Sequence, residues 1–155
     1  MTLGKGVRIG RCTIIATGQG ISIGDFVGVG DGTLLDAHHG KINIHQHTAI
    51  GPYVVVYGEG GVTIGKYSML AAHAVVVASN HVYDSIDMPI KLQGTTAEGV
   101  SIADDVWIGT HAVIQDGVSI GKGSIVGSGA VVRVDIPEYM VAAGVPARII
   151  KNRIV

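Results

Sequence analysis

The chain has 155 residues, a hydrophobic content of 47% and a net charge of −1 with histidine counted as neutral. This length suits a single domain with a sizeable core. Basic residues are dispersed, so the sequence lacks the basic face that a general nucleic-acid surface needs. Its apolar runs are soon broken by glycine, histidine or charge, so we expect no membrane span. The N-terminus does not have the pattern of a secretory signal, and we expect a cytoplasmic protein.

The dominant feature of the sequence is an aliphatic residue at every sixth position, in a series that starts at Ile9. The series is out of step four times, after Ile15, Leu35, Val56 and Val76. The three intervals between these residues are 20, 21 and 20, so extra residues enter once per three hexads. A small or β-branched residue follows most of the aliphatic residues by four positions. This period predicts a solenoid with three flat faces, one short strand per face, and coils about 4.8 Å apart.

The hexads predict a β-helix over residues 1–137, interrupted after His81 by a loop over 82–101. The period resumes in register at Ile102, and we interpret the interruption as the candidate active site. Residues 138–155 leave the period and contain prolines, which predicts a capping tail. A short helix is one way in which this tail could end.

Six further histidines fall outside the loop: His38, His39, His45, His47, His73 and His111. His73 and His111 take the same place in adjacent coils, so we expect them to stack on one outer face. Packing of this pair is favoured over a metal site. The remaining four form a local cluster without a matched spacing, and we interpret them as surface histidines.

The hexads, the sequence "VWIG" at 106–109 and the ending "VAAGVPARII" at 141–150 resemble the left-handed β-helix acyltransferases with hexapeptide repeats. Within that family they are most similar to sugar O-acetyltransferases of the galactoside and maltose type and to polysaccharide-modifying relatives. The resemblance implies an all-β, left-handed parallel β-helix and a homotrimer with active sites between subunits. It also implies acetyl-CoA as co-substrate, and no metal is expected.

The resemblance assigns the role of general base to His81 and an acceptor-binding role to Glu59. It places the coenzyme on Thr110, Ser128, Arg133, Arg148 and Lys151. To these we add Trp107 as a flat wall near the thioester, and Gly109 for its backbone near the oxyanion. Because a sugar needs several directional partners, we add polar residues of the loop as acceptor contacts, with solvated loop polarity as the alternative: Asp84, Asp87, Lys91 and Gln93.

Imidazole suits the removal of a proton from a hydroxyl, because its ordinary pKa is near 6.5. Either Glu59 or a backbone carbonyl could orient the ring of His81. The N–H groups near Gly109 and Thr110 are our candidates for stabilising the oxyanion.

The leading hypothesis is an acetyl-CoA-dependent O-acetyltransferase that acts directly on a hydroxyl of a sugar or saccharide-containing acceptor. One alternative is an antibiotic O-acetyltransferase of the same superfamily. Another is a metal-binding or structural β-helix, such as an ice-binding protein, which regular outward threonine rows would favour. The identity of the acceptor, and acetyl against a longer acyl donor, stay open.

Overall fold

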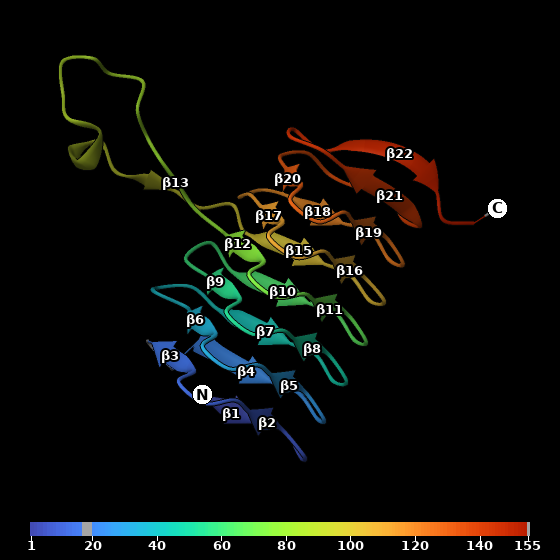
Figure 1. Cartoon of the computed structure of the whole chain (residues 1–155). Helices are drawn as coiled ribbons and strands as arrows, with labels where there is room; N and C mark the ends of the chain where they lie inside the picture. The colour runs from blue at the N-terminus through green and yellow to red at the C-terminus, as the bar shows by residue number, and fades with distance from the viewer. Residues whose placement is uncertain (17–19, 155) are drawn as a thin grey trace.

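The computed structural model describes residues 1–16 and 20–154. The chain winds into a stack of coils, each made of three short strands, with the N-terminus at one end and a capping hairpin at the other (Figure 1). Equivalent strands of successive coils pair in parallel and form three sheets, which are the faces of a prism. This arrangement confirms the all-β solenoid that the hexads predict.

Sheets A, B and C are built from the first, second and third strand of each coil. Sheet A contains β1 (Thr2–Leu3), β4 (Ile21–Ile23), β7 (Ile42–Ile44), β10 (Val62–Ile64), β15 (Val100–Ile102) and β18 (Ser119–Ile120). Sheet B contains β2 (Arg8–Ile9), β5 (Gly28–Val29), β8 (Ala49–Ile50), β11 (Met69–Leu70), β16 (Trp107–Ile108), β19 (Ile125–Val126), β21 (Met140–Ala143) and β22 (Arg148–Asn152). Sheet C contains β3 (Ile14–Ala16), β6 (Leu34–Asp36), β9 (Val55–Tyr57), β12 (Val75–Val77), β17 (Val113–Ile114) and β20 (Val131–Val132).

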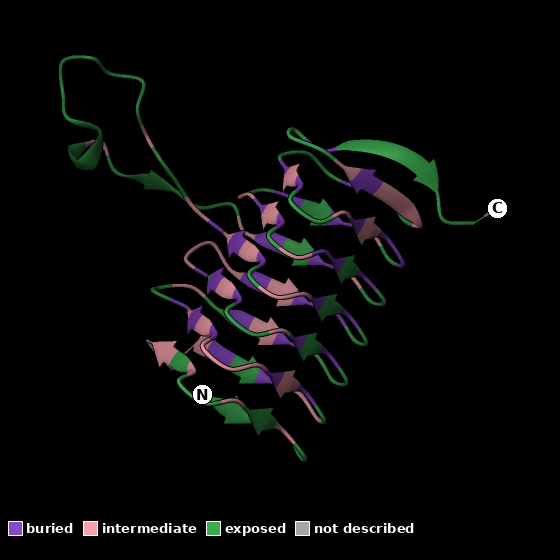
Figure 2. Cartoon of the chain, viewed as in Figure 1, coloured by how far each residue is buried: buried purple, intermediate pink, exposed green. Residues whose placement is uncertain are grey.

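The repeated aliphatic residues form the core of the prism (Figure 2). From Ile23 onward every aliphatic residue of the series is buried, whereas Ile9 in the end coil remains 42% exposed. Hydroxyl groups at the small inward positions donate to carbonyl groups of the next coil, as Thr48 Oγ1 does to Gly65 O at 2.8 Å. These bonds let a narrow core hold polar side chains without unpaired donors.

The outer rows of sheets A and C differ in chemistry, because residues that alternate with the core positions point outward. The outer row of sheet C is aliphatic: Ile14, Leu34, Val55, Val75, Val113 and Val131. The outer row of sheet A is polar: Thr2, Ser22, Asn43, Thr63, Ser101 and Ser119. This mixed polar row is not the regular threonine row that would favour ice binding.

An arm interrupts the coils between β12 and β15 (Figure 1). It contains β13 (Asn80–His81), a short 3-10 helix (Ile90–Leu92) and β14 (Thr95–Thr96), and β13 pairs with β14 in antiparallel fashion. The arm extends away from the prism and is almost entirely exposed (Figure 2). The coil resumes at Val100 in β15, so the interruption ends two residues earlier than the predicted range of 82–101.

The tail caps sheet B with a hairpin: β21 pairs in parallel with β19, and β22 pairs in antiparallel fashion with β21. The short helix considered for its end is wrong, because residues 148–152 form a strand. The hairpin covers the edge of β19 that would otherwise be open to another chain. No helix in the described part of the chain is long and apolar enough to cross a membrane.

Candidate functional site

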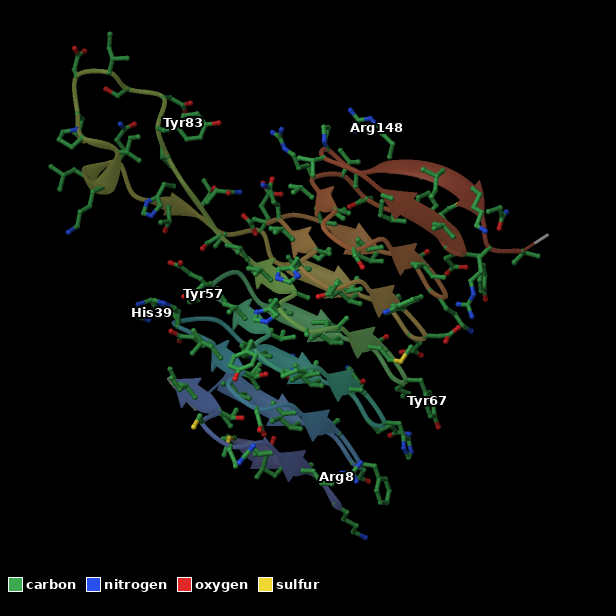
Figure 3. The ribbon with its side chains drawn as sticks, in the orientation of Figure 1. Arg8, His39, Tyr57, Tyr67, Tyr83 and Arg148 are labelled. Carbon is green, nitrogen blue, oxygen red and sulfur yellow. The ribbon has the colours of Figure 1, made fainter. Side chains whose placement is uncertain are left out.

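A hollow of about 260 Å³ lies at the corner between sheets C and A, below the base of the arm. Three successive coils and the arm contribute to its wall. The lining residues are His38, Tyr57, Glu59, Val77, Ser79, Asn80 and His81. Figure 3 shows Tyr57, and the neighbouring His39, on the side of the prism from which the arm departs. The structure therefore brings the predicted base and the predicted acceptor carboxylate, Glu59, into one hollow.

His81 occupies the last position of β13, where its backbone pairs with Thr95 across the base of the arm. Thr95 Oγ1 donates to Glu59 Oε1 at 3.4 Å, so Glu59 is tied to the strand that faces His81. Within residues 1–16 and 20–154 the ring of His81 makes no hydrogen bond of its own. The base of the arm thus positions His81 through the backbone.

His38 also lines the hollow, although the sequence interpretation placed this residue among the surface histidines. Its side chain is 49% exposed, and its Nε2 lies 3.3 Å from Asp36 Oδ2. The other carboxylate oxygen, Asp36 Oδ1, accepts a hydrogen bond of 2.9 Å from the backbone N–H of His38. Tyr57 contacts the same ring edge-on, with centroids 6.4 Å apart. The Asp36-x-His38 spacing at a coil corner is the sequence signal that could have identified this residue.

Most residues predicted to bind coenzyme gather near the corner between sheets B and C, in the coils closest to the cap. Trp107 lies on the outer face of sheet B, 47% exposed, beside Met69. Thr110 and Ser128 occupy this corner in successive coils. Arg148 and Lys151 extend from β22, and Figure 3 shows Arg148 at the C-terminal end of the molecule. Arg133 follows β20 on the opposite side of sheet C, so it does not join them within one chain.

At the same corner, the backbone N–H groups of Ala72, Thr110 and Ser128, which lie in successive coils, donate no hydrogen bond within the described residues. The N–H of Gly109 donates to Val126 O at 2.8 Å, so it is not free to bind an oxyanion in this arrangement. In the first coil the corresponding N–H at this corner, that of Arg11, is bound by an aspartate of the following coil, Asp31 Oδ1, at 2.8 Å. The coil that follows Thr110 has Ser128 at this place, and the N–H of Thr110 donates no hydrogen bond within the described residues. Thr110 therefore remains the backbone candidate.

The polar residues of the arm differ in what they contact. Gln93 is held inside the arm, because its Nε2 donates to Ser85 O and Met88 O, both at 2.8 Å, and its Oε1 accepts from Ser85 N. Asp84, Asp87 and Lys91 are exposed. None of the four lines the hollow within the same chain.

The expected stacking of His73 and His111 is confirmed, with ring centroids 4.8 Å apart and an interplanar angle of 14°, although the pair lies at the corner between sheets B and C and not on a flat face. Tyr53 extends the stack below His73 at 5.2 Å. Thr110 Oγ1 donates to Ala72 O and lies 3.1 Å from His111 Nδ1. Among the described residues there is no group of three or more histidine, cysteine or acidic side chains that could hold a metal ion. The observed contacts of this pair are those of packing.

His47 belongs to a second stack, between Phe26 at 5.2 Å and Tyr67 at 4.9 Å. Both stacks lie at coil corners where the backbone takes a left-handed conformation, with φ of 60° at His47 and 61° at His73. Of the four histidines interpreted as a surface cluster, His47 is therefore a rung of an aromatic ladder and His38 lines the hollow.

Comparisons with known proteins agree with this architecture. Residues 99–133 match the family described as bacterial transferase hexapeptide (six repeats). A protein of Mycobacterium tuberculosis named as an acetyltransferase is 36% identical over 151 residues, which are 97% of this chain and 49% of that protein. This chain thus spans about half the length of that relative.

WbbJ of Escherichia coli K12, named as an O-acetyl transferase of lipopolysaccharide biosynthesis, is 33% identical over 140 residues, 85% of this chain and 71% of its own. The solved structure of AntD, an N-acyltransferase from Bacillus cereus, in complex with dTDP and coenzyme A is 28% identical. It covers 98% of this chain and 83% of its own, with a TM-score of 0.88. The repeat, the parallel prism and these similarities show that the chain belongs to the bacterial transferase hexapeptide family, with its left-handed β-helix.

Proposed function

We propose that this chain is an acetyl-CoA-dependent O-acetyltransferase that modifies a hydroxyl of a sugar or of a saccharide-containing acceptor. The observation that carries the proposal is the hollow in which the imidazole of His81, the carboxylate of Glu59 and the ring of Tyr57 meet. Such a lining suits a sugar, because an aromatic wall covers the C–H face while polar groups bind the hydroxyls. With about 260 Å³, the hollow fits a single sugar ring.

His81 acts in this proposal as the general base. The acceptor oxygen bonds to the carbonyl carbon of the thioester while His81 takes the hydroxyl proton. The carbon–sulfur bond then breaks, and the proton passes from His81 to the sulfur of the leaving coenzyme. The imidazole is thereby regenerated, and no group of the protein carries the acetyl group.

The corner between sheets B and C supplies the coenzyme groove. The unpaired N–H of Thr110 can stabilise the negative charge on the carbonyl oxygen, while Trp107 provides a flat wall. The cations of Arg148 and Lys151 suit phosphate groups. Ser128 lies between Thr110 and the cap along the same corner.

We further propose a homotrimer, because the two halves of the site lie on different corners of one chain. His81 stands at the corner between sheets C and A, and Thr110 at the corner between B and C. Sheet C separates them, and its aliphatic outer row suits a contact with another copy. The arm adds exposed apolar side chains that a neighbouring copy would cover: Tyr83, Ile86, Met88, Ile90 and Leu92.

Transfer to an amine is the second candidate, because the backbone closely matches that of the N-acyltransferase AntD. Transfer to a hydroxyl of an antibiotic remains an alternative, and it would differ from transfer to a sugar only in the residues that contact the acceptor. A panel of methyl glycosides, amino sugars and hydroxyl-bearing antibiotics, assayed for coenzyme A release, separates the three. Where coenzyme A is detected with a thiol reagent, the exposed Cys12 is first replaced by serine, so that the reagent reacts only with the released coenzyme. The proposal expects release with methyl glycosides.

The test of the mechanism is His81→Ala. Turnover should fall about 10²-fold or more, the size expected for a lost general base, while acetyl-CoA still raises the melting temperature. His45→Ala, an exposed histidine outside the hollow, serves as the matched control. A His81→Ala variant that binds coenzyme and keeps more than a tenth of the turnover would refute the role of His81.

A further inference from the structure

The carboxylate of Asp36 contacts His38 at two points, and the proposed chemistry assigns no role to this pair. Oδ1 of Asp36 accepts from the backbone N–H of His38 at 2.9 Å, and Oδ2 lies 3.3 Å from its ring Nε2. The side chain of Asp36 is only 18% exposed, against 49% for His38. The ring is thus fixed from the protein side while it remains accessible from the hollow.

The contact with Asp36 favours one tautomer of the ring. An ionised carboxylate can only accept hydrogen bonds, so Oδ2, at 3.3 Å from Nε2, stabilises the neutral tautomer that carries its proton on Nε2. Nδ1 then keeps a lone pair and is the nitrogen that remains for a ligand. Tyr57 contacts the same ring edge-on, with the ring centroids 6.4 Å apart.

We propose that His38 is an acceptor-binding residue that determines specificity. Its Nδ1 accepts a hydrogen bond from a hydroxyl of the acceptor other than the one that is acetylated. This inference rests on the proposed function, and it names the recognised chemistry as a ring with a second hydroxyl within reach of the first. Asp36 acts as a positioning residue, since it holds the tautomer in which Nδ1 is an acceptor.

Substitutions at His38 can be chosen to preserve its backbone. The φ of His38 is 48°, a left-handed value that glycine and asparagine tolerate. His38→Gly therefore removes the ring without strain, and His38→Asn keeps a shorter side chain with an acceptor oxygen. His45→Ala, an exposed histidine outside the hollow, is the control, since His39 contacts the ring of His38 edge-on with centroids 6.3 Å apart.

The kinetic test uses the methyl glycoside that is acetylated best and its monodeoxy derivatives. His38→Gly should raise the KM for the glycoside about three- to tenfold, the range of one hydrogen bond, with kcat nearly unchanged. His38→Asn should recover part of this loss. The deoxy derivative that lacks the partner hydroxyl should be a poor substrate of the wild type, yet lose nothing further in His38→Gly. Additive losses for every deoxy derivative would overturn the proposal.

A nuclear magnetic resonance experiment on ¹⁵N-labelled histidine tests the tautomer without acetyl-CoA. His38 should carry its proton on Nε2, and Asp36→Asn, whose amide can donate to Nε2, should move the proton to Nδ1 with a parallel rise in KM. A wild-type ring protonated on Nδ1 would overturn the inference about His38. A failure of every glycoside to be acetylated would instead refute the proposed function, so the two failures are distinguishable.

Discussion

Asp31 shows how one side chain joins two coils. Its Oδ1 accepts from Arg11 N at 2.8 Å, and its Oδ2 accepts from the guanidinium at 2.9 Å. The backbone hydrogen bond first, and the side-chain bond second, hold the pKa of Asp31 below its ordinary value. Because these bonds favour the charged carboxylate, they stabilise the fold above the ordinary pKa of about 3.9 and are lost as the pH falls through the lowered pKa.

We therefore expect Asp31→Asn to lower the melting temperature at neutral pH, with a difference from the wild type that shrinks once the pH is below about 4. Thermal unfolding of both proteins across this range measures the effect. Asp87→Asn on the exposed arm is the control and should show no such difference. A gap between wild type and Asp31→Asn that stays constant down to acid pH would contradict this account.

Gly109 is required by the spacing between coils. A Cβ at this position would lie 2.5 Å from Ser128 N, in the backbone of the next coil. We expect Gly109→Ala to cost about 1 to 3 kcal/mol of unfolding free energy, as overpacking does. Gly28, in sheet B, has nothing within 4 Å of its added Cβ, so Gly28→Ala should be neutral or slightly stabilising. Denaturant unfolding of Gly109→Ala and Gly28→Ala measures the two changes in unfolding free energy. Equal losses in both variants would contradict this account.

At the scale of elements, the side chain of Gln93 stabilises the conformation of the arm. Gln93 bonds to Ser85 and Met88 across the loop that these residues close. Gln93→Ala should raise hydrogen exchange within the arm, whereas protection of the coils and the melting temperature should stay near the wild-type values. Gln115→Ala, on the prism, is the matched control. A global loss of protection in Gln93→Ala would mean that the arm supports the prism.

The sequence predicted the prism better than its attachments. A six-residue period needs only the alternation of inward and outward positions, so the core positions follow from pattern alone. The arm has no period, and its closure depends on the tertiary contacts of Gln93 and on the pairing of His81 with Thr95. The place of His38 in the hollow was not predicted for the same reason, since Tyr57 and Glu59, which line the hollow with it, come from the next coil.

At the scale of the whole molecule, the separation of the two halves of the site predicts complementation. Copies with His81→Ala keep the coenzyme half, and copies with Arg148→Ala and Lys151→Ala keep the base. Mixed trimers refolded from equal amounts should recover about a quarter of the wild-type activity at limiting acetyl-CoA, the fraction of interfaces that combine two intact halves. Mixing without refolding is the control. Activity that does not rise after refolding together would place both halves in one chain.

The arm leaves the register of the prism untouched. Val62 pairs with Ile42 on one side and with Val100 on the other, although the arm lies between Val62 and Val100. Partners in adjacent coils are 20 residues apart for Lys5 and Asp25, and 38 apart for Lys66 and Asp104 across the arm. Closing a chain segment almost twice as long costs only about 0.6 kcal/mol. Mutation can therefore lengthen, shorten or exchange this insertion at little cost to the folding of the prism, so the sequence and length of the arm can diverge almost independently of the scaffold that carries it.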